Sequence, residues 1–141
     1  MKYIVYISTT SKILTDSELA EMLKENYLNN RRANINGMLI YTEGSFIQVL
    51  EGSEDSLRRT YQEIIQDSRQ KNIIKLAEDT INVPNFNNWS MAFIPSDPAK
   101  VATLEGYINP VSNNFLRTAN NHAAVMLLKS FAKDNRITYS L

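Results

Sequence analysis

Residues 38–50 read MLIYTEGSFIQVL, and this stretch decides the fold because it holds two strand-like runs around a short polar turn. Both runs are rich in β-branched and aromatic side chains, which is typical of strands. Gly44 lies in the turn, and glycine readily takes the positive φ that tight hairpin turns need. The stretch therefore predicts a β-hairpin with strands at 38–41 and 46–50.

The segment before the hairpin predicts one strand and one helix. Residues 3–7 alternate β-branched and aromatic side chains, which favours a strand. Thr15 and Glu18 have the spacing of a capping box, in which each side chain binds a backbone amide at a helix start. We expect the helix to cover 16–28 and to end at Asn29-Asn30.

The segment after the hairpin predicts a helix and two strands. Ser53 is a suitable N-cap for a helix that runs to about Asp67, and strands are expected at 73–81 and 90–93. The resulting order, β-α-β-β-α-β with a short fifth strand, is the ferredoxin-like arrangement. We therefore predict an α+β domain with an antiparallel sheet and two helices on one of its faces.

The chain changes character from residue 98 onward. The spacing of Val101, Leu104 and Tyr107 predicts one short helix, and residues 119–133 predict a second. Residues 109–118 are rich in Asn and Ser and predict a loop. We expect a core domain at 1–95 and a C-terminal helical extension at 96–141 that packs on it.

Composition excludes several classes of protein. Fifteen basic residues balance fifteen acidic ones, so there is no electrostatic attraction to nucleic acid or to an anionic membrane. The absence of cysteine excludes disulfides, thiolate nucleophiles and Cys-ligated metals. No apolar run approaches the roughly 20 residues of a membrane helix, and the N-terminus does not resemble a signal peptide. We expect a soluble, cytoplasmic protein.

Gln48 is the most unusual residue of the predicted sheet. Its side chain shares a strand face with Phe46 and Leu50, and an unpaired buried amide costs about 1–3 kcal/mol. Tyr6 lies on the neighbouring central strand, and its phenol could donate to that amide. Two structural interpretations stay open: a Gln48 that reaches solvent at a sheet edge, and a core Tyr6 whose hydroxyl lies at the rim.

Two other pairs also have both a structural and a functional interpretation. Asn29 and Asn30 are suited to a helix C-terminus, but an Asn amide also matches the donors and acceptors of a planar imide. Trp89 and Met91 share one strand face, where they either pack in the core or form a lid that carries a signal.

The remaining polar candidates are weaker. Asp67 and Arg69, at the end of the second helix, are solvated charges by default. His122 is the single histidine and has no partner for a metal site or a catalytic pair, so we interpret it as a surface or structural residue. No phosphate-binding loop is present, because the glycines are scattered.

Taken together, these residues resemble one family. The motifs, in order, are Tyr6, Asn29-Asn30 before INGML (35–39), SFIQVLEG (45–52), IIQDSR (64–69) and WSM (89–91). This series is similar to BLUF domains (blue-light sensing using FAD) over roughly residues 2–94. The strand motif F-x-Q-x-L-E-G and the triplet W-S-M are its most specific parts. The C-terminal segment resembles that of short, single-domain members with no fused enzyme.

The resemblance implies a flavin, FAD, held non-covalently between the two helices. It implies these roles: Tyr6 and Gln48 as the photoactive pair, Asn30 with Asn29 at the pyrimidine edge, Ile64 on the ring facing Met22, Asp67 and Arg69 at the ribityl and phosphate groups, and Trp89 or Met91 in signalling. Glu63 and Gln70 depart from the arginine and histidine that the family often has there. Phosphate contacts from these two positions are therefore not expected, which makes FMN and riboflavin alternative cofactors. Arg31 or Arg32 could make the phosphate contacts instead.

The mechanism that the resemblance implies is a hydrogen-bond switch. Light drives electron and proton transfer from Tyr6, Gln48 rotates or tautomerises, and the absorption moves slightly to the red. The signal then passes through the fifth strand and the C-terminal helices. The implied partners are further copies of the chain and a downstream response protein of unknown identity, without direct nucleic-acid or membrane binding and without catalysis.

Two other functions are considered. A ferredoxin-like RNA-binding module would expose aromatic residues on its third strand, which Gly44-Ser45-Phe46 resembles faintly. Zero net charge and a single aromatic in that strand count against it. A flavin-using enzyme would need an acid–base pair or a nicotinamide-phosphate loop, and neither is visible.

Overall fold

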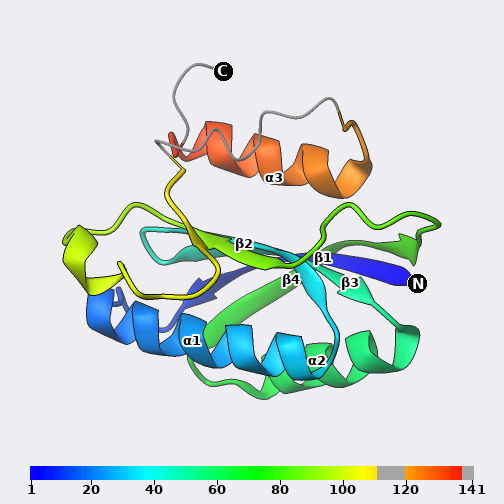
Figure 1. Cartoon of the computed structure of the whole chain (residues 1–141), viewed down its shortest axis with the longest axis horizontal. Helices are drawn as coiled ribbons and strands as arrows, with labels where there is room; N and C mark the ends of the chain where they lie inside the picture. Colours follow the sequence, from blue (N-terminus) through cyan, green and yellow to red (C-terminus); the bar gives the residue numbers. More distant parts are fainter. Residues whose placement is uncertain (111–119, 138–141) are drawn as a thin grey trace.

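The computed structural model describes residues 1–110 and 120–137. Its elements follow in chain order: β1 (Lys2–Thr10), α1 (Asp16–Arg32), β2 (Asn36–Thr42), β3 (Ser45–Gly52), α2 (Glu54–Gln66), β4 (Gln70–Thr80), β5 (Trp89–Ala92), the 3₁₀ turn η1 (Pro98–Lys100), β6 (Tyr107–Ile108) and α3 (Ala123–Asp134). Helices α1 and α2 lie on one face of the sheet and α3 lies on the other (Figure 1).

The sheet has the strand order β4-β1-β3-β2-β5-β6. Strands β1 to β4 pair antiparallel in the ferredoxin-like order, which confirms the predicted α+β fold. The expectation of a wholly antiparallel sheet is wrong, because β5 pairs parallel to β2 and β6 pairs parallel to β5. The chain leaves β4 at one edge and returns on the far side of β2, and this long connection makes a parallel pairing feasible.

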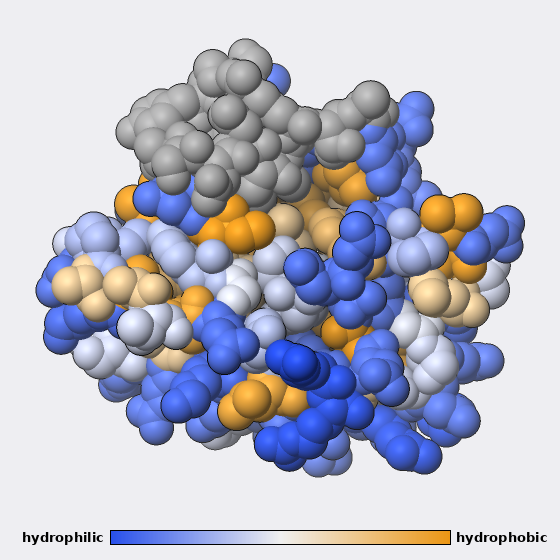
Figure 2. All heavy atoms as spheres, in the orientation of Figure 1, coloured by the Kyte–Doolittle hydropathy of each residue, from blue (hydrophilic) through white to orange (hydrophobic). Residues whose placement is uncertain are grey.

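Two apolar layers enclose the central strands. Ile4, Phe46 and Leu50 pack with α1 and α2 on one face, whereas Val5 and Val49 pack with α3 on the other. Helices therefore cover both sides of β1 and β3, which explains why these strands are apolar on both faces. The outer surface in the same view is mostly hydrophilic, with scattered hydrophobic residues (Figure 2).

Helix α1 begins as predicted and ends later. The capping box is confirmed, because the Glu18 amide donates to the Thr15 hydroxyl at 3.2 Å and the Thr15 amide donates to the Glu18 carboxylate at 3.2 Å. The predicted end at Asn29-Asn30 is wrong: the helix continues to Arg32, and Asn34 takes the left-handed conformation at φ 56°. Basic residues in the last turn favour this extension, which puts both asparagines inside α1.

The C-terminal extension differs from the prediction in its first part. The helix expected from Val101 to Tyr107 is wrong, because η1 ends at Lys100, residues 101–106 contain turns but no helix, and Tyr107 belongs to β6. The second predicted helix is confirmed as α3, with a later start at Ala123. Its N-cap is His122, whose Nδ1 accepts the Ala124 amide at 3.1 Å, so the histidine has a structural role. Residues 111–119, which include most of the predicted loop, lie outside the described residues.

Glu51, at the end of β3, fixes the connection between β4 and β5. Glu51 is 2% exposed, and its carboxylate accepts the amides of Asn85 at 2.9 Å and Phe86 at 3.1 Å, together with the Asn85 side chain at 2.8 Å. Asn85 in turn accepts the Asn120 side-chain amide at 2.8 Å, just before α3. One buried acid therefore joins β3 to the start of the C-terminal helix.

We expect Glu51→Gln to lower the free energy of unfolding by about 2 kcal/mol, because an amide group keeps only one acceptor oxygen and leaves a buried donor unsatisfied. Urea denaturation of both proteins measures this difference. Glu21→Gln, at an exposed position on α1, is the control and is expected to change stability by less than about 0.5 kcal/mol. Equal effects of the two substitutions would contradict the role of Glu51.

Candidate functional site

Tyr6 and Gln48 lie directly opposite each other on β1 and β3. Tyr6 is 0% exposed and Gln48 is 2% exposed. Tyr6 belongs to the apolar cluster beneath α1 and α2, so the pair lies on the helix-covered face of the sheet. The predicted cross-strand contact is confirmed. The two structural alternatives are wrong, because β3 is central rather than an edge strand and the Tyr6 hydroxyl is buried.

In the part of the chain that the structure describes, three side-chain atoms are buried without a hydrogen-bond partner, and they lie on this face. They are the Tyr6 hydroxyl, Gln48 Nε2 and Trp89 Nε1. Each such atom costs about 1–3 kcal/mol, and native proteins contain few of them. Their position in one apolar cluster indicates a place where function, rather than stability, has set the residue types.

Burial raises the pKa of the Tyr6 phenol well above its ordinary value, and the nearby amides of Gln48 and Gln70 oppose this increase in part. Neither amide reaches the hydroxyl with full hydrogen-bond geometry, but both are near enough to act on its charge. Tyr6 is therefore a neutral phenol at physiological pH and has one proton to donate.

A cavity of about 70 Å³ lies beside Gln48, between α1 and α2. It brings together six of the predicted residues, namely Asn29, Asn30, Gln48, Ile64, Asp67 and Arg69. Ligand pockets usually measure about 300–1,000 Å³. A large planar ring therefore fits here only when side chains at the mouth, such as the half-buried Ile64, move aside.

The other predicted residues lie behind this cavity. Met22 is buried in the apolar cluster against which Ile64 packs, but it does not line the cavity. Trp89 and Met91 are buried in the same cluster and therefore share the helix-covered face, as predicted. Met91 is in register with Leu39, and Leu39 is in register with Gln48, so a single row of side chains crosses the sheet.

Asp67 and Arg69 form an ion pair at the mouth of the cavity. The Arg69 guanidinium donates to the Asp67 carboxylate through Nε at 3.1 Å and Nη2 at 2.9 Å, and Nη1 lies 3.0 Å from Glu25 on α1. These charges are therefore paired, although both side chains remain partly exposed. The hydrogen bonds from Arg69 lower the pKa of Asp67, and the same pairing raises the pKa of Arg69.

Two residues of the site had no assigned role in the sequence. Gln70 lines the cavity and is 6% exposed, and its Oε1 accepts the Ser8 hydroxyl at 2.7 Å. Gln70 preceded the predicted fourth strand, so no periodicity placed it on a face. Ser8 was predictable in part, because it follows Tyr6 by two residues and shares its face.

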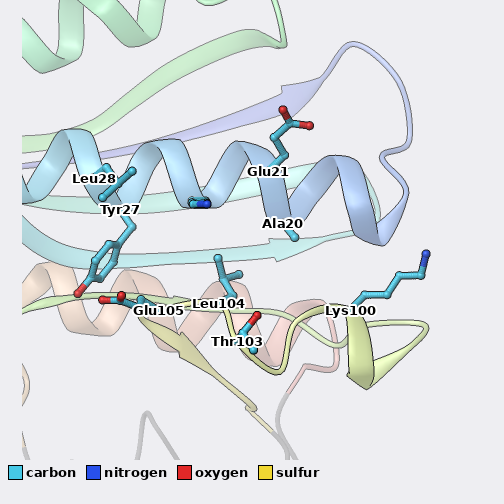
Figure 3. A pocket seen from close by; sticks show the side chains of 9 residues that line it. Ala20, Glu21, Tyr27, Leu28, Lys100, Thr103, Leu104 and Glu105 are labelled. Carbon is cyan, nitrogen blue, oxygen red and sulfur yellow. The ribbon is translucent and has the colours of Figure 1, made fainter.

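A larger hollow on the other side of α1 is less suited to chemistry. It measures about 570 Å³ and is lined by Leu28 and Leu104 among others, and Figure 3 shows the Tyr27 side chain of α1 extending towards Glu105. None of the three unsatisfied buried atoms belongs to its lining. Within the described residues, no group of His, Asp and Glu side chains is placed to hold a metal ion.

The fold and the site together define a ferredoxin-like domain with a polar ligand site beneath its two helices. Residues 1–92 match the model of the BLUF family, the sensors of blue-light using FAD, and the chain belongs to this family. It is a blue-light-sensing, flavin-binding domain.

The most informative relatives are light-regulated proteins. The chain is 32% identical over 71 residues to photoactivated adenylate cyclase subunit alpha of Euglena gracilis, an alignment that covers 50% of this chain and 7% of that protein. A bacterial light-regulated adenylyl cyclase structure is 30% identical with a TM-score of 0.61, and covers 95% of this chain and 33% of that one. The chain thus spans a small part of these relatives.

The ground-state structure of BlsA has a similar fold along nearly the whole chain. The TM-score is 0.60 at 24% identity, and the alignment covers 99% of this chain and 90% of that one.

We expect Asp67→Asn to lower the free energy of unfolding at neutral pH by up to about 1 kcal/mol, the range for a partly exposed ion pair. Because the folded-state pKa of Asp67 is lowered, the wild-type advantage exists above the ordinary aspartate pKa and is lost as the pH falls through the lowered value. Thermal unfolding of both proteins from pH 7 to pH 2 measures this. A difference that does not change with pH would contradict the assignment.

Proposed function

We propose that this chain senses blue light through FAD bound non-covalently between α1 and α2, with Tyr6 and Gln48 as the photoactive pair. The observation that carries the proposal is that Tyr6 and Gln48 are buried directly opposite each other, with the Tyr6 hydroxyl and Gln48 Nε2 both lacking a hydrogen-bond partner. Buried polar groups of this kind need a partner, and a polar ring edge placed between the helices supplies one.

The cavity residues fit a flavin in chemistry. Asn30 is 5% exposed, and its amide offers both a donor and an acceptor to the pyrimidine edge, with the exposed Asn29 assisting. Ile64 would pack on the ring, and Met22 would support it from the core. Asp67 and Arg69 would contact the ribityl and phosphate groups. Arg69 is already paired with two acids, so FMN and riboflavin remain alternatives to FAD.

FAD, when bound, supplies the absorption of blue light and an excited state that accepts an electron. Tyr6 would be the residue that passes an electron and its phenolic proton to the excited flavin and takes both back. Gln48 would rotate or tautomerise during this exchange, so that its amide offers a changed set of hydrogen bonds. The position of Gln48 directly opposite Tyr6 supports this coupling, since Gln48 is the register partner of Tyr6 on the facing strand.

The signal passes from Gln48 to β5. The row Gln48–Leu39–Met91 continues to Tyr107 on β6, and the Met91 amide donates to the Gly106 carbonyl at 2.8 Å. Met91, with Trp89 beside it on the same face, is thus next to the C-terminal extension. The output is contact with a downstream response protein or with further copies of the chain, and no reaction is catalysed.

The alternative of an RNA-binding module is disfavoured. Such modules present an open sheet face to stacked bases, whereas here α3 packs on the face that α1 and α2 leave free.

No helix in the described part of the chain combines the length and the apolar character that a membrane span needs. We propose that the protein acts in the cytoplasm.

Tyr6→Phe is expected to keep bound flavin and to abolish the light-induced red shift, because the ring still packs and the transferable proton is lost. Visible absorption of the purified protein in darkness, after a blue flash and during recovery measures this. Gln48→Leu should also abolish the shift, since no amide remains to reorient.

Tyr61→Phe is the matched control for Tyr6→Phe. Its ring lies 5.7 Å from the Tyr6 ring on the same face, but it has no place in the hydrogen-bond exchange and should keep a normal response. A normal red shift in Tyr6→Phe would refute the photoactive pair, and a wild-type protein that ignores added FAD would refute the cofactor.

A further inference from the structure

Gln70 is a second buried glutamine beside Tyr6. It lines the same cavity as Gln48 and begins β4, on the opposite side of β1 from β3. The β1–β4 ladder is irregular between Ile7 and Thr9. Such irregularities often occur next to functional sites, where they redirect a side chain. Here the start of β4 turns Gln70 towards the helix-covered face, where its Oε1 accepts the Ser8 hydroxyl at 2.7 Å.

The hydrogen bond from Ser8 fixes what Gln70 can offer. Ser8 is 3% exposed and lies on the same face of β1 as Tyr6. Because the Gln70 carbonyl oxygen is taken by the serine hydroxyl, the group that Gln70 can turn towards the phenol is its NH₂, a donor. The lowering effect of Gln70 on the pKa of Tyr6 agrees with a donor near the phenol oxygen.

We propose that Ser8 and Gln70 are positioning residues that set the direction of the hydrogen bonds at the photoactive pair. The structure shows the first bond of this chain, from the Ser8 hydroxyl to the Gln70 carbonyl. In the dark, flavin-loaded protein the donors would continue in the same direction, from Gln70 N–H to the Tyr6 oxygen and from Tyr6 O–H to the Gln48 carbonyl. This inference rests on the proposed function of Tyr6 and Gln48, and it adds a cause for the orientation that Gln48 has in darkness.

The direction follows from the number of donors and acceptors at each group. A phenol has one proton, so a Tyr6 oxygen that accepts from Gln70 directs that proton to its other neighbour, Gln48. The Gln48 carbonyl then faces Tyr6, and its NH₂ faces the ring site. Without Gln70, the Tyr6 hydroxyl can rotate and accept from Gln48 Nε2, so the dark protein would partly adopt the orientation that light otherwise produces.

The test uses the FAD-loaded full chain with four variants: Ser8→Ala, Ser8→Thr, Gln70→Met and Tyr61→Phe. Ser8→Ala and Gln70→Met break the donor chain, and we expect each to reduce the light-induced red shift and to slow thermal recovery by about two- to tenfold, the effect of one net hydrogen bond. Ser8→Thr keeps the hydroxyl and should behave as wild type. Tyr61→Phe changes the neighbouring ring alone and should also be unaffected.

A second measurement needs no flavin. Tyrosine labelled with ¹³C at Cζ, assigned with Tyr6→Phe, reports the pKa of the Tyr6 phenol by NMR in the flavin-free protein. Loss of the Gln70 donor should raise that pKa in Ser8→Ala and in Gln70→Met but not in Ser8→Thr. This readout also covers the case in which Gln70→Met binds FAD poorly, because it needs no flavin. Ser8→Ala changes a smaller group and provides a second, milder variant.

The outcomes separate this inference from the proposed function. If the wild type shows a red shift while Ser8→Ala and Gln70→Met keep its amplitude, its recovery rate and the pKa of Tyr6, the positioning role is wrong and the photoreceptor stands. If the wild type shows no red shift, the proposed function fails, and the NMR measurement alone decides whether Gln70 donates to Tyr6.

Discussion

The antiparallel pairing of β1 with β3 is the constraint on which the rest of the molecule depends. Both strands are central and buried on both faces, so their register is fixed by two apolar layers at once. A slip of one residue would move every side chain of one strand to the opposite face. Tyr6 would then face α3 while Gln48 stayed beneath α1 and α2. The same packing that stabilises the domain therefore holds the phenol opposite the amide.

This constraint explains why polar atoms without partners persist in the core. Many of the neighbours of Tyr6 and Gln48 are apolar, and no described protein group satisfies the Tyr6 hydroxyl or Gln48 Nε2. The domain bears this cost of a few kcal/mol because the surrounding apolar layers supply enough stability. Glu51, on the same strand, shows the contrast: it is equally buried, but its carboxylate accepts several donors. Satisfied polar groups hold the fold, and unsatisfied ones mark the site.

The parts that depend on local pattern were predictable from the sequence, and the parts that depend on distant pairing were not. Hairpin alternation and the capping box at Thr15 predicted β2, β3 and α1, and strand periodicity put Tyr6 and Gln48 on one face. The parallel pairing of β5, the ion pair of Arg69 with Glu25, and the contact of Ser8 with Gln70 join residues far apart in the chain, and no local periodicity encodes them. The roles assigned to the flavin-contacting residues came from resemblance and stay proposals.

A reorientation of the Gln48 side chain can affect the elements on either face of the sheet, but it does not affect the two faces equally. On its own face, Gln48 is followed by Leu39 and Met91 in one row, and these side chains lie in register on adjacent strands. Helix α3 lies on the opposite face, so the Gln48 side chain does not point towards it and acts on it only through the backbone of β3 or through Glu51. Side-chain packing transmits displacement more directly than a hydrogen-bonded backbone that is held on both sides. The short β5 and β6 strands, rather than α3, are therefore the first elements that a reoriented Gln48 would disturb.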